Sequence, residues 1–213
     1  MMPVRPDIVL LFTRYPEPGR CKTRLIPALG RDGAADLHRD MTCRVLAQVT
    51  RLAAIRPHLL EIHYDGSTED QMRAWLGPDL HYRQQAAGDI GGRMQAAISR
   101  YQGRMQRLLL VGSDCPGLTA EIMAEAFMAL TTHDLVLGPA FDGGYYLIGT
   151  HQESSRLICR TLFQDMPWGT DNVYPTTKMR ADQQRLRCHT LARLHDIDTP
   201  ADLRYLHHHS HPQ

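Results

Sequence analysis

The chain has 213 residues, with 24 basic and 23 acidic side chains and a formal net charge of +1. A near-neutral protein lacks the broad positive field that binds nucleic acid or anionic membranes, so we expect neither partner. Its length suits one domain over residues 1–206, followed by a flexible His-rich tail over residues 207–213. Five cysteines without a CxxC pair, and no apolar run long enough for a membrane span, predict free thiols in a cytoplasmic protein.

Strand-like and helical patterns alternate along the chain. In order, we expect strand 7–13, helix 31–55, strand 59–65, a short helix opened by Thr68, helix 90–101, strand 107–112, helix 119–130, strand-like runs 134–141 and 145–151, helix 153–163, strand 188–197 and a final helix from Thr199-Pro200. This alternation predicts an α/β fold, a mostly parallel sheet with helices on both faces. The Asp142-Gly143-Gly144 segment between two strand runs predicts an antiparallel hairpin within it.

Three polar segments follow predicted strands. They are the loop from Arg14 to Arg24, the Ser113-Asp114 pair and the turn at Asp142-Gly143-Gly144. In parallel sheets, ligands bind beyond the carboxyl ends of the strands. We therefore expect these segments to share one ligand site.

The first of these loops is basic. Arg20, Lys22 and Arg24 are suited to phosphate oxygens, and Arg14 is a further but weaker candidate. Gly19 permits a tight turn close to a ligand. The run Gly19-Arg20-Cys21-Lys22-Thr23 lacks the Gly directly before Lys that a Walker motif needs, so it is not a P-loop. A merely solvated basic loop is the alternative interpretation.

Acidic residues lie at two predicted strand ends. Asp114 is well placed to hold Mg²⁺ or Mn²⁺, which prefer oxygen ligands. Asp196 and Asp198 flank Ile197, and either of them could supply a second carboxylate. Turn formation or helix capping explains the same acids without a metal.

The segment after the predicted hairpin turn combines flexibility with aromatic rings. Gly143 and Gly144 permit close approach to a ligand, and Tyr145 offers stacking and a hydroxyl group to a sugar or acceptor. Trp168 lies in a loop before a further helix. A tight hairpin with packed tyrosines, and a Trp that fills the edge of the core, are the structural alternatives.

Six ordered motifs carry a resemblance to a known family: LLFTRYPEPGRCKTRL, QQAAGDIGGRMQAAI, LLLVGSDCPGLT, GPAFDGGYYLIG, MPWGTDNVYPTT and HDIDTPADL. Together they resemble the DUF2064, or glycosyltransferase-like, bacterial proteins. That family is similar to nucleotide-diphospho-sugar transferases of the GT-A type, with a three-layer α/β/α fold, and to phospholactate guanylyltransferases.

The resemblance implies roles for particular residues. It implies phosphate binding by Arg20, Lys22, Thr23 and Arg24, and a nucleotide or acceptor contact by Gly91, Gly92 and Arg93. It also implies metal binding by Asp114 and Asp198, with Asp196 as a substitute.

The expected function is a metal-dependent transfer from a nucleotide or nucleotide-sugar donor to an unknown small-molecule acceptor. Asp114 and Asp142 are the catalytic candidates, with Asp142 orienting the acceptor. Glycosyltransferases of this fold commonly carry a DxD motif, and this chain has Asp114-Cys115-Pro116 instead. This departure argues against sugar transfer from a nucleotide-sugar and leaves nucleotidyl transfer as a possible reaction. The alternatives are a non-catalytic nucleotide-binding module and a scaffold whose motifs are relics, and the sequence leaves the oligomeric state open.

Overall fold

The structure, a computed structural model, describes residues 5–209, with side chains up to Leu206. Its centre is a seven-stranded sheet in the order β3-β2-β1-β4-β6-β5-β7. The strands are β1 (Asp7–Arg14), β2 (Leu59–Asp65), β3 (His81–Gln84), β4 (Arg107–Gly112), β5 (Leu135–Pro139), β6 (Tyr145–His151) and β7 (Cys188–Thr190). All neighbouring strands pair in parallel except β6, which is antiparallel to both β4 and β5. The mostly parallel mixed sheet expected from the sequence is confirmed.

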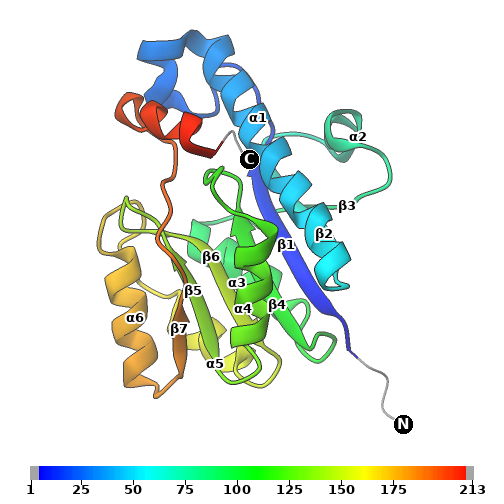
Figure 1. Cartoon of the computed structure of the whole chain (residues 1–213), viewed down its shortest axis with the longest axis vertical. Coiled ribbons are helices and arrows are strands. Elements are labelled where there is room, and N and C mark those ends of the chain that lie inside the picture. Colours follow the sequence, from blue (N-terminus) through cyan, green and yellow to red (C-terminus); the bar gives the residue numbers. More distant parts are fainter. Residues whose placement is uncertain (1–4, 210–213) are drawn as a thin grey trace.

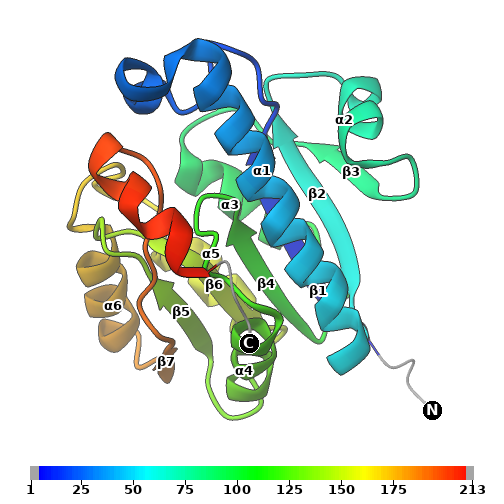
Figure 2. The ribbon, with the colours of Figure 1, turned by 45° about the horizontal axis from the view of Figure 1, so that its top comes forward.

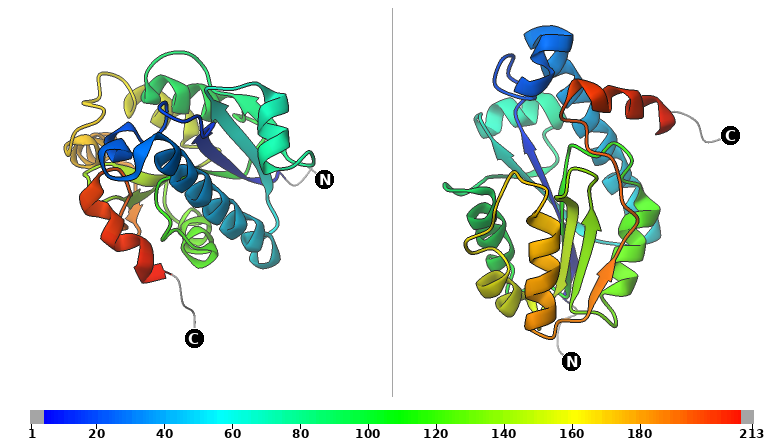
Figure 3. Two further views of the ribbon diagram at one scale, coloured as in Figure 1. Left: turned by 90° about the horizontal axis from the view of Figure 1, so that it is seen from above. Right: turned by 90° about the vertical axis from the view of Figure 1, so that its left-hand side faces the viewer.

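Helices cover both faces of this sheet and make a three-layer α/β/α arrangement (Figures 1 and 3). One layer contains α1 (Ile26–Ile55) and α4 (Ala120–Ala129), and the other contains α3 (Ile90–Ser99), α5 (Ser155–Thr161) and α6 (Val173–Gln183). The short helix α2 (Glu69–Leu76) lies beside the β3 edge. Two 3-10 helices, η1 (Thr23–Leu25) and η2 (Pro200–His209), complete the fold.

The alternating side chains of β1 divide the core into two layers. Val9 and Leu11 pack with residues of α1 and α4, whereas Ile8, Leu10 and Phe12 pack with residues of α3, α5 and α6. This division follows from the two-residue period of a strand, which sends successive side chains to opposite faces. Every residue of β1 from Asp7 to Thr13 is buried, as expected for a central strand covered on both faces.

A third, smaller apolar cluster lies beyond the carboxyl ends of the central strands. Leu25, Ala34 and Met41 pack with Ile197, and Leu203 and Leu206 of η2 lie against them. The start of α1 and helix η2 therefore sit together beyond the carboxyl ends of β1 and β4 (Figure 2). Segments at opposite ends of the sequence are joined there by hydrophobic packing.

Several local predictions are confirmed. Thr68 forms the predicted capping box with Gln71, and Thr119 accepts a hydrogen bond from the Ile122 amide. The two strand runs around Asp142 form the antiparallel pair β5–β6. All five cysteines are free thiols. Among the described residues, no helix is long and apolar enough to cross a membrane.

Other boundaries differ from the sequence-based expectations. Helix α1 begins at Ile26 rather than at residue 31, because a kink at Gly30, with φ of 73°, joins a short first turn to the main helix. The expected strand 188–197 pairs only over β7, and Leu194 adds an isolated bridge to Ala140. Strand β3 was not predicted, since its four residues give too short a pattern. Residues 210–213 of the His-rich tail expected from 207 lie outside the described residues, and the backbone of 207–209 completes η2.

Candidate active site at the carboxyl end of the sheet

Lys22 is the centre of the candidate site. Its side chain is only 5% exposed, and Nζ lies 3.0 Å from Asp114 Oδ1 and 3.7 Å from Asp198 Oδ1. The residue adopts a left-handed backbone conformation, with φ of 47°, which costs a non-glycine residue about 1 kcal/mol or more. This turn of the loop after β1 directs the ammonium group inward to the two acids.

Asp114 and Asp198 are brought together by a backbone contact. The Ile197 amide donates to the Asp114 carbonyl at 3.0 Å, and the Ile197 side chain is completely buried. Asp114 follows β4, so this bond fixes the segment of Asp196 and Asp198 beside the end of that strand. Asp202 accepts hydrogen bonds from the amides of Asp198 and Thr199, which holds the start of η2.

The charges of this cluster stabilise one another. Burial by itself lowers the pKa of Lys22, but the carboxylates of Asp114 and Asp198 outweigh it, and the net pKa is raised. Desolvation by itself raises the pKa of Asp114, but the Lys22 ammonium outweighs it, and the net pKa is lowered. Lys22 is therefore a resident cation, and Asp114 is ionised at neutral pH.

The other residues of the basic loop point in different directions. Arg24 donates to Asp198 at 2.8 Å, so it belongs to the same cluster. Thr23 begins η1 directly after Lys22 and is exposed. The guanidinium of Arg20 is 74% exposed and pairs with Glu17, so it lies away from the acids.

A second polar cluster surrounds Asp65, at the end of β2. Its Oδ2 accepts from Arg14 at 2.7 Å and from Arg93 at 3.0 Å. Desolvation opposes ionisation, but the two guanidinium groups outweigh it and lower the pKa of Asp65. The sequence reasoning missed Asp65, although its position at a strand end was a signal that could have found it.

The start of α3 is held by packing and capping. Gly91 is buried, and a Cβ atom there would lie 2.5 Å from Cζ2 of Trp168. The Gly92 amide donates to the side chain of Asp89, the N-cap residue of α3, at 2.7 Å. These contacts account for both glycines structurally, and they place Trp168 against the start of α3.

The turn between β5 and β6 lies beside the acids. Asp142 Oδ1 accepts from the Gly144 amide at 2.8 Å. Gly143 has φ of +91°, and a Cβ there would lie 2.2 Å from Asp171 Cα, so the turn packs directly on the loop before α6. The rings of Tyr145 and Trp168 meet edge to face at 6.5 Å.

Three cavities open around this turn: one of about 350 Å³ that reaches Arg24, Asp198 and Asp202, and two smaller ones beside it. One, of about 270 Å³, is lined by Asp114, Asp142, Asp196 and Asp198. The other, of about 200 Å³, is more apolar and includes Trp168 and Ile90. The residues that line both are Gly112, Asp142, Gly144, Tyr145 and Tyr146. An acidic chamber thus adjoins an apolar, aromatic one, an arrangement suited to a ligand with a charged and a ring-bearing part.

Two further titratable groups border the acidic cavity. Partial burial and the neighbouring Asp142 carboxylate raise the pKa of Asp196 to about 6. Burial raises the pKa of the Cys115 thiol well above its usual value. Cys115 is therefore a neutral thiol at physiological pH, which excludes a thiolate nucleophile at this position.

His38 of α1 is a residue that the sequence reasoning did not single out. It is 4% exposed, its Nε2 lies 2.9 Å from the Arg14 carbonyl, and its Nδ1 lies 3.7 Å from Asp114 Oδ1. Nδ1 makes no hydrogen bond with any described residue. Burial lowers the pKa of His38, although Asp114 partly opposes this effect. Only the fold brings this helix residue to Asp114, so no local motif marks it.

The acids beside Lys22 are candidate ligands for a divalent cation. Among the described residues, no three Asp, Glu, His or Cys side chains already converge closely enough to hold an ion. Asp114 and Asp198 nevertheless share the Lys22 ammonium, and His38 Nδ1 is an orphaned buried atom facing the same carboxylate. Carboxylate oxygens are the preferred ligands of Mg²⁺ and Mn²⁺. The residues therefore fit a cation that replaces the ammonium between the acids.

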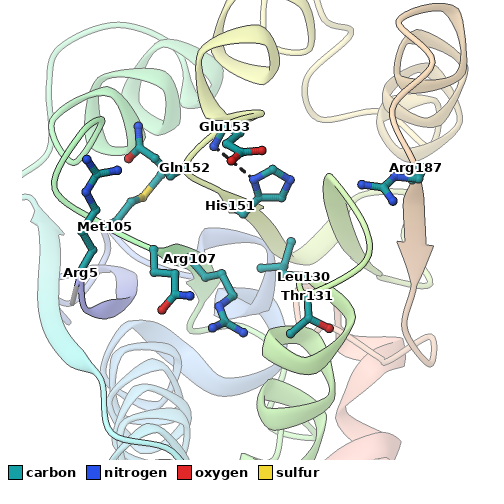
Figure 4. Close-up of a pocket in the computed structure, with 10 residues that line it drawn as sticks. Arg5, Met105, Arg107, Leu130, Thr131, His151, Gln152, Glu153 and Arg187 are labelled. Carbon is teal, nitrogen blue, oxygen red and sulfur yellow. Dashed lines mark hydrogen bonds between the residues drawn. The ribbon is translucent and has the colours of Figure 1, made fainter. Parts of the chain in front are cut away.

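A separate cavity, of about 460 Å³, lies at the other end of the sheet. It is lined by Arg107 at the start of β4 and by His151 at the end of antiparallel β6 (Figure 4). Its arginines are largely engaged, since Arg107 pairs with Asp7 and Arg187 pairs with Asp134. None of the sequence-predicted site residues lines this cavity.

Solved structures share this fold. A protein of Desulfovibrio desulfuricans G20, provisionally described as a nucleotide-diphospho-sugar transferase, is 36% identical over 94% of this chain and 85% of its own, with a TM-score of 0.86. CMP:2-keto-3-deoxy-manno-octonic acid synthetase in complex with CTP is 9% identical, over 94% of this chain and 96% of its own, with a TM-score of 0.58.

A third structure is glucosyl-3-phosphoglycerate synthase of Mycobacterium tuberculosis, in complex with Mn²⁺, UDP and glucosyl-3-phosphoglycerate. It is 12% identical, over 94% of this chain and 75% of its own, with a TM-score of 0.57. No curated protein matches the sequence significantly.

The fold and the polar site at the carboxyl ends of the strands define a protein of the nucleotide-diphospho-sugar transferase class. Within that class, residues 46–170 match the model of the family described as "Uncharacterized protein conserved in bacteria (DUF2064)". The chain belongs to the DUF2064 family.

Proposed function

We propose that this protein is a metal-dependent transferase with a nucleotide or nucleotide-sugar donor and a small-molecule acceptor. The observation that carries the proposal is the convergence of Lys22 on Asp114 and Asp198, from three separate segments of the chain. The Desulfovibrio relative and the nucleotide-bound structures of the same fold support the general class. The five free thiols are compatible with a cytoplasmic protein.

Asp114 and Asp198 would hold Mg²⁺ or Mn²⁺, with Asp196, which lines the same cavity, as a substitute for one of them. Such a cation, when bound, polarises phosphate oxygens and stabilises the negative charge that develops on them. Lys22 and Arg24 are paired with these acids in the free protein. If a bound metal ion neutralised the acids, both positive side chains would become available to phosphate groups. Lys22 is thus a buried, preorganised positive group at the site, and Arg24 is an exposed one.

The acceptor side of the site lies at the β5–β6 turn. Asp142 lines the acidic cavity together with Asp114 and so can orient an acceptor hydroxyl or acid. Tyr145 and Trp168 line the adjoining cavity and offer ring faces to a base or sugar. The remaining proposed donor contacts are Arg20, Thr23, Gly91, Gly92 and Arg93.

Two transfer chemistries fit this arrangement. An acceptor oxygen attacks phosphorus in nucleotidyl transfer and the anomeric carbon in glycosyl transfer. The acids come from two distant segments, Asp114 and Asp198, rather than from one DxD motif, and this separation favours nucleotidyl transfer. Release of pyrophosphate from a nucleoside triphosphate, or of a nucleoside diphosphate from a nucleotide-sugar, would identify which of the two occurs.

A thermal-shift panel tests the proposal. Nucleoside triphosphates and nucleotide-sugars are each added with Mg²⁺ or Mn²⁺, and the melting temperature is measured. A ligand at about 100 times its dissociation constant adds roughly 2.7 kcal/mol of stability, which is easily detected. We expect Asp114→Asn to lose the metal-dependent part of this increase.

Glu121→Gln is the matched control, because Glu121 is an exposed carboxylate that pairs with Arg51 on the outer helices. It should retain the full ligand response. The site is misplaced if Asp114→Asn binds nucleotide and metal as tightly as the parent. Recovery of intact nucleotide after incubation with every acceptor class would favour a non-catalytic binding module instead.

A further inference from the structure

His38 has one ring nitrogen satisfied and one without a partner. Nε2 lies 2.9 Å from the Arg14 carbonyl, which can only accept, so the hydrogen is assigned to Nε2. In the neutral ring, Nδ1 then carries a lone pair. This nitrogen is buried, has no hydrogen-bond partner among the described residues and lies 3.7 Å from Asp114 Oδ1.

A lone pair that faces a carboxylate oxygen is an unfavourable arrangement by itself. Leaving a buried acceptor unsatisfied is destabilising, and here a second acceptor adds repulsion. A positive group placed between the two atoms would remove this repulsion. In this structure the Lys22 ammonium lies 3.0 Å from the same Oδ1 atom but leaves Nδ1 without a hydrogen bond.

The imidazole is held rigidly at this position. Thr42, one helical turn further along α1, shares a hydrogen bond of 3.1 Å with Thr13 of β1, so the helix is fixed against the central strand. The bond from Nε2 to a backbone carbonyl is the type of contact that orients metal-binding histidines and fixes their tautomer. His38 therefore has the orientation of a ligand rather than that of a solvent-exposed base.

We propose that His38 Nδ1 is a nitrogen ligand of the divalent cation held by Asp114, and that it makes this site select a transition metal over Mg²⁺. This inference rests on the proposed function and adds a residue from α1 to the metal site. Mg²⁺ prefers a shell of oxygen ligands, whereas imidazole nitrogen is a good ligand for transition metals. Mn²⁺ accepts both oxygen and nitrogen ligands, so its binding reports on the imidazole nitrogen.

The test measures metal binding directly, without turnover. Dissociation constants of Mn²⁺ and Mg²⁺ are determined by calorimetry for the parent, His38→Gln and Asp114→Asn, alone and with pyrophosphate, which contains no nitrogen. Gln can keep an amide hydrogen for the Arg14 carbonyl while removing the nitrogen that faces Asp114. We expect His38→Gln to weaken Mn²⁺ binding at least about tenfold and to leave Mg²⁺ binding within about twofold.

Electron spin-echo spectroscopy of bound Mn²⁺ supplies a second, independent readout. The parent should show the ¹⁴N modulation of a coordinated imidazole, and protein labelled with ¹⁵N at histidine should lose it. His38→Gln should lose it as well. The parent spectrum decides the question even if His38→Gln does not fold, because absence of ¹⁴N modulation from the parent overturns the proposal.

The outcomes separate this inference from the proposed function. An unchanged ratio of Mn²⁺ to Mg²⁺ affinity in a folded His38→Gln protein overturns the role of His38 and leaves the Asp114 site intact. Both proposals are supported if Asp114→Asn binds neither metal while His38→Gln loses only its preference for Mn²⁺. If the parent binds neither metal, with or without pyrophosphate, both proposals fail.

Discussion

The ammonium of Lys22 lies 3.0 Å from Asp114 Oδ1, although one residue follows β1 and the other follows β4. The two strands are neighbours in the sheet, so their carboxyl ends meet at one edge. The pair is an internal ion pair of the free protein, with one nearly buried partner. It places a positive charge beside the two acids, at the site proposed for the donor phosphates.

Removal of the Lys22 charge should impair donor binding. We expect Lys22→Met to weaken the binding of pyrophosphate or a nucleoside triphosphate by about tenfold or more, because a charged hydrogen bond contributes about 1.5–3 kcal/mol. Arg51→Ala is the matched control: its guanidinium is exposed and pairs with Glu121 on the outer helices, so the affinity should stay within about twofold. Calorimetric titration of both variants measures the difference. A loss in Arg51→Ala as large as that in Lys22→Met would contradict this assignment.

Gly143 should tolerate no side chain. Its φ is +91°, and an added Cβ would lie 2.2 Å from the Asp171 backbone, so Gly143→Ala combines backbone strain with a clash. We expect it to lower the unfolding free energy by about 2–4 kcal/mol. Gly103→Ala has a similar φ of +83° with open space around it, and should lose only about 1 kcal/mol. Urea unfolding of both variants separates strain from clash, and equal losses would show that Asp171 does not confine the turn.

Gly91 should control the position of Trp168. Gly91→Ala puts a methyl group 2.5 Å from the indole, which must then move outward. In a Trp75→Phe background, Trp168 is the remaining tryptophan, and we expect its fluorescence to shift to the red and to be quenched more readily by acrylamide. Gly92→Ala, whose Cβ would meet only the Asp89 side chain, should leave the emission unchanged. An unaltered spectrum in the Gly91 variant would show that the indole does not rest on this glycine.

Low pH should destabilise the fold because it protonates Glu61, a residue that lies away from the candidate site. Burial opposes its ionisation, but hydrogen bonds from His63 and Tyr101 and the charge of Arg83 lower its pKa to about 2. Because this folded value is below the ordinary 4.5, the stabilisation is complete above pH 4.5 and is lost as the pH falls towards 2. The difference corresponds to about 3 kcal/mol.

Glu61→Gln tests this acid dependence. Its unfolding free energy should fall less than that of the parent between about pH 5 and pH 2. Denaturant unfolding at a series of pH values provides the comparison. Parallel pH profiles for the two proteins would assign the acid sensitivity to other carboxylates, such as Asp134, whose pKa is also lowered to about 2.

Much of the fold could be predicted because its signals are local. The apolar runs of β1 and β4, the capping residues Thr68 and Thr119 and the Asp-Gly turn after β5 each depend on neighbours in sequence. Short β3 and the kink at Gly30 escaped prediction, because four residues give no clear period and a glycine alone does not reveal its φ.

The sequence by itself determined which loops lie at the carboxyl ends of the strands, and so which residues were candidates. Only the tertiary structure decided that Lys22 turns inward while Arg20 turns outward, since this depends on the backbone conformation at Lys22 and on buried Ile197. It alone brought His38 and Asp65 to the candidate site. Such contacts join segments far apart in the chain, and they arise from packing of helices on a sheet, which no local pattern of residues encodes.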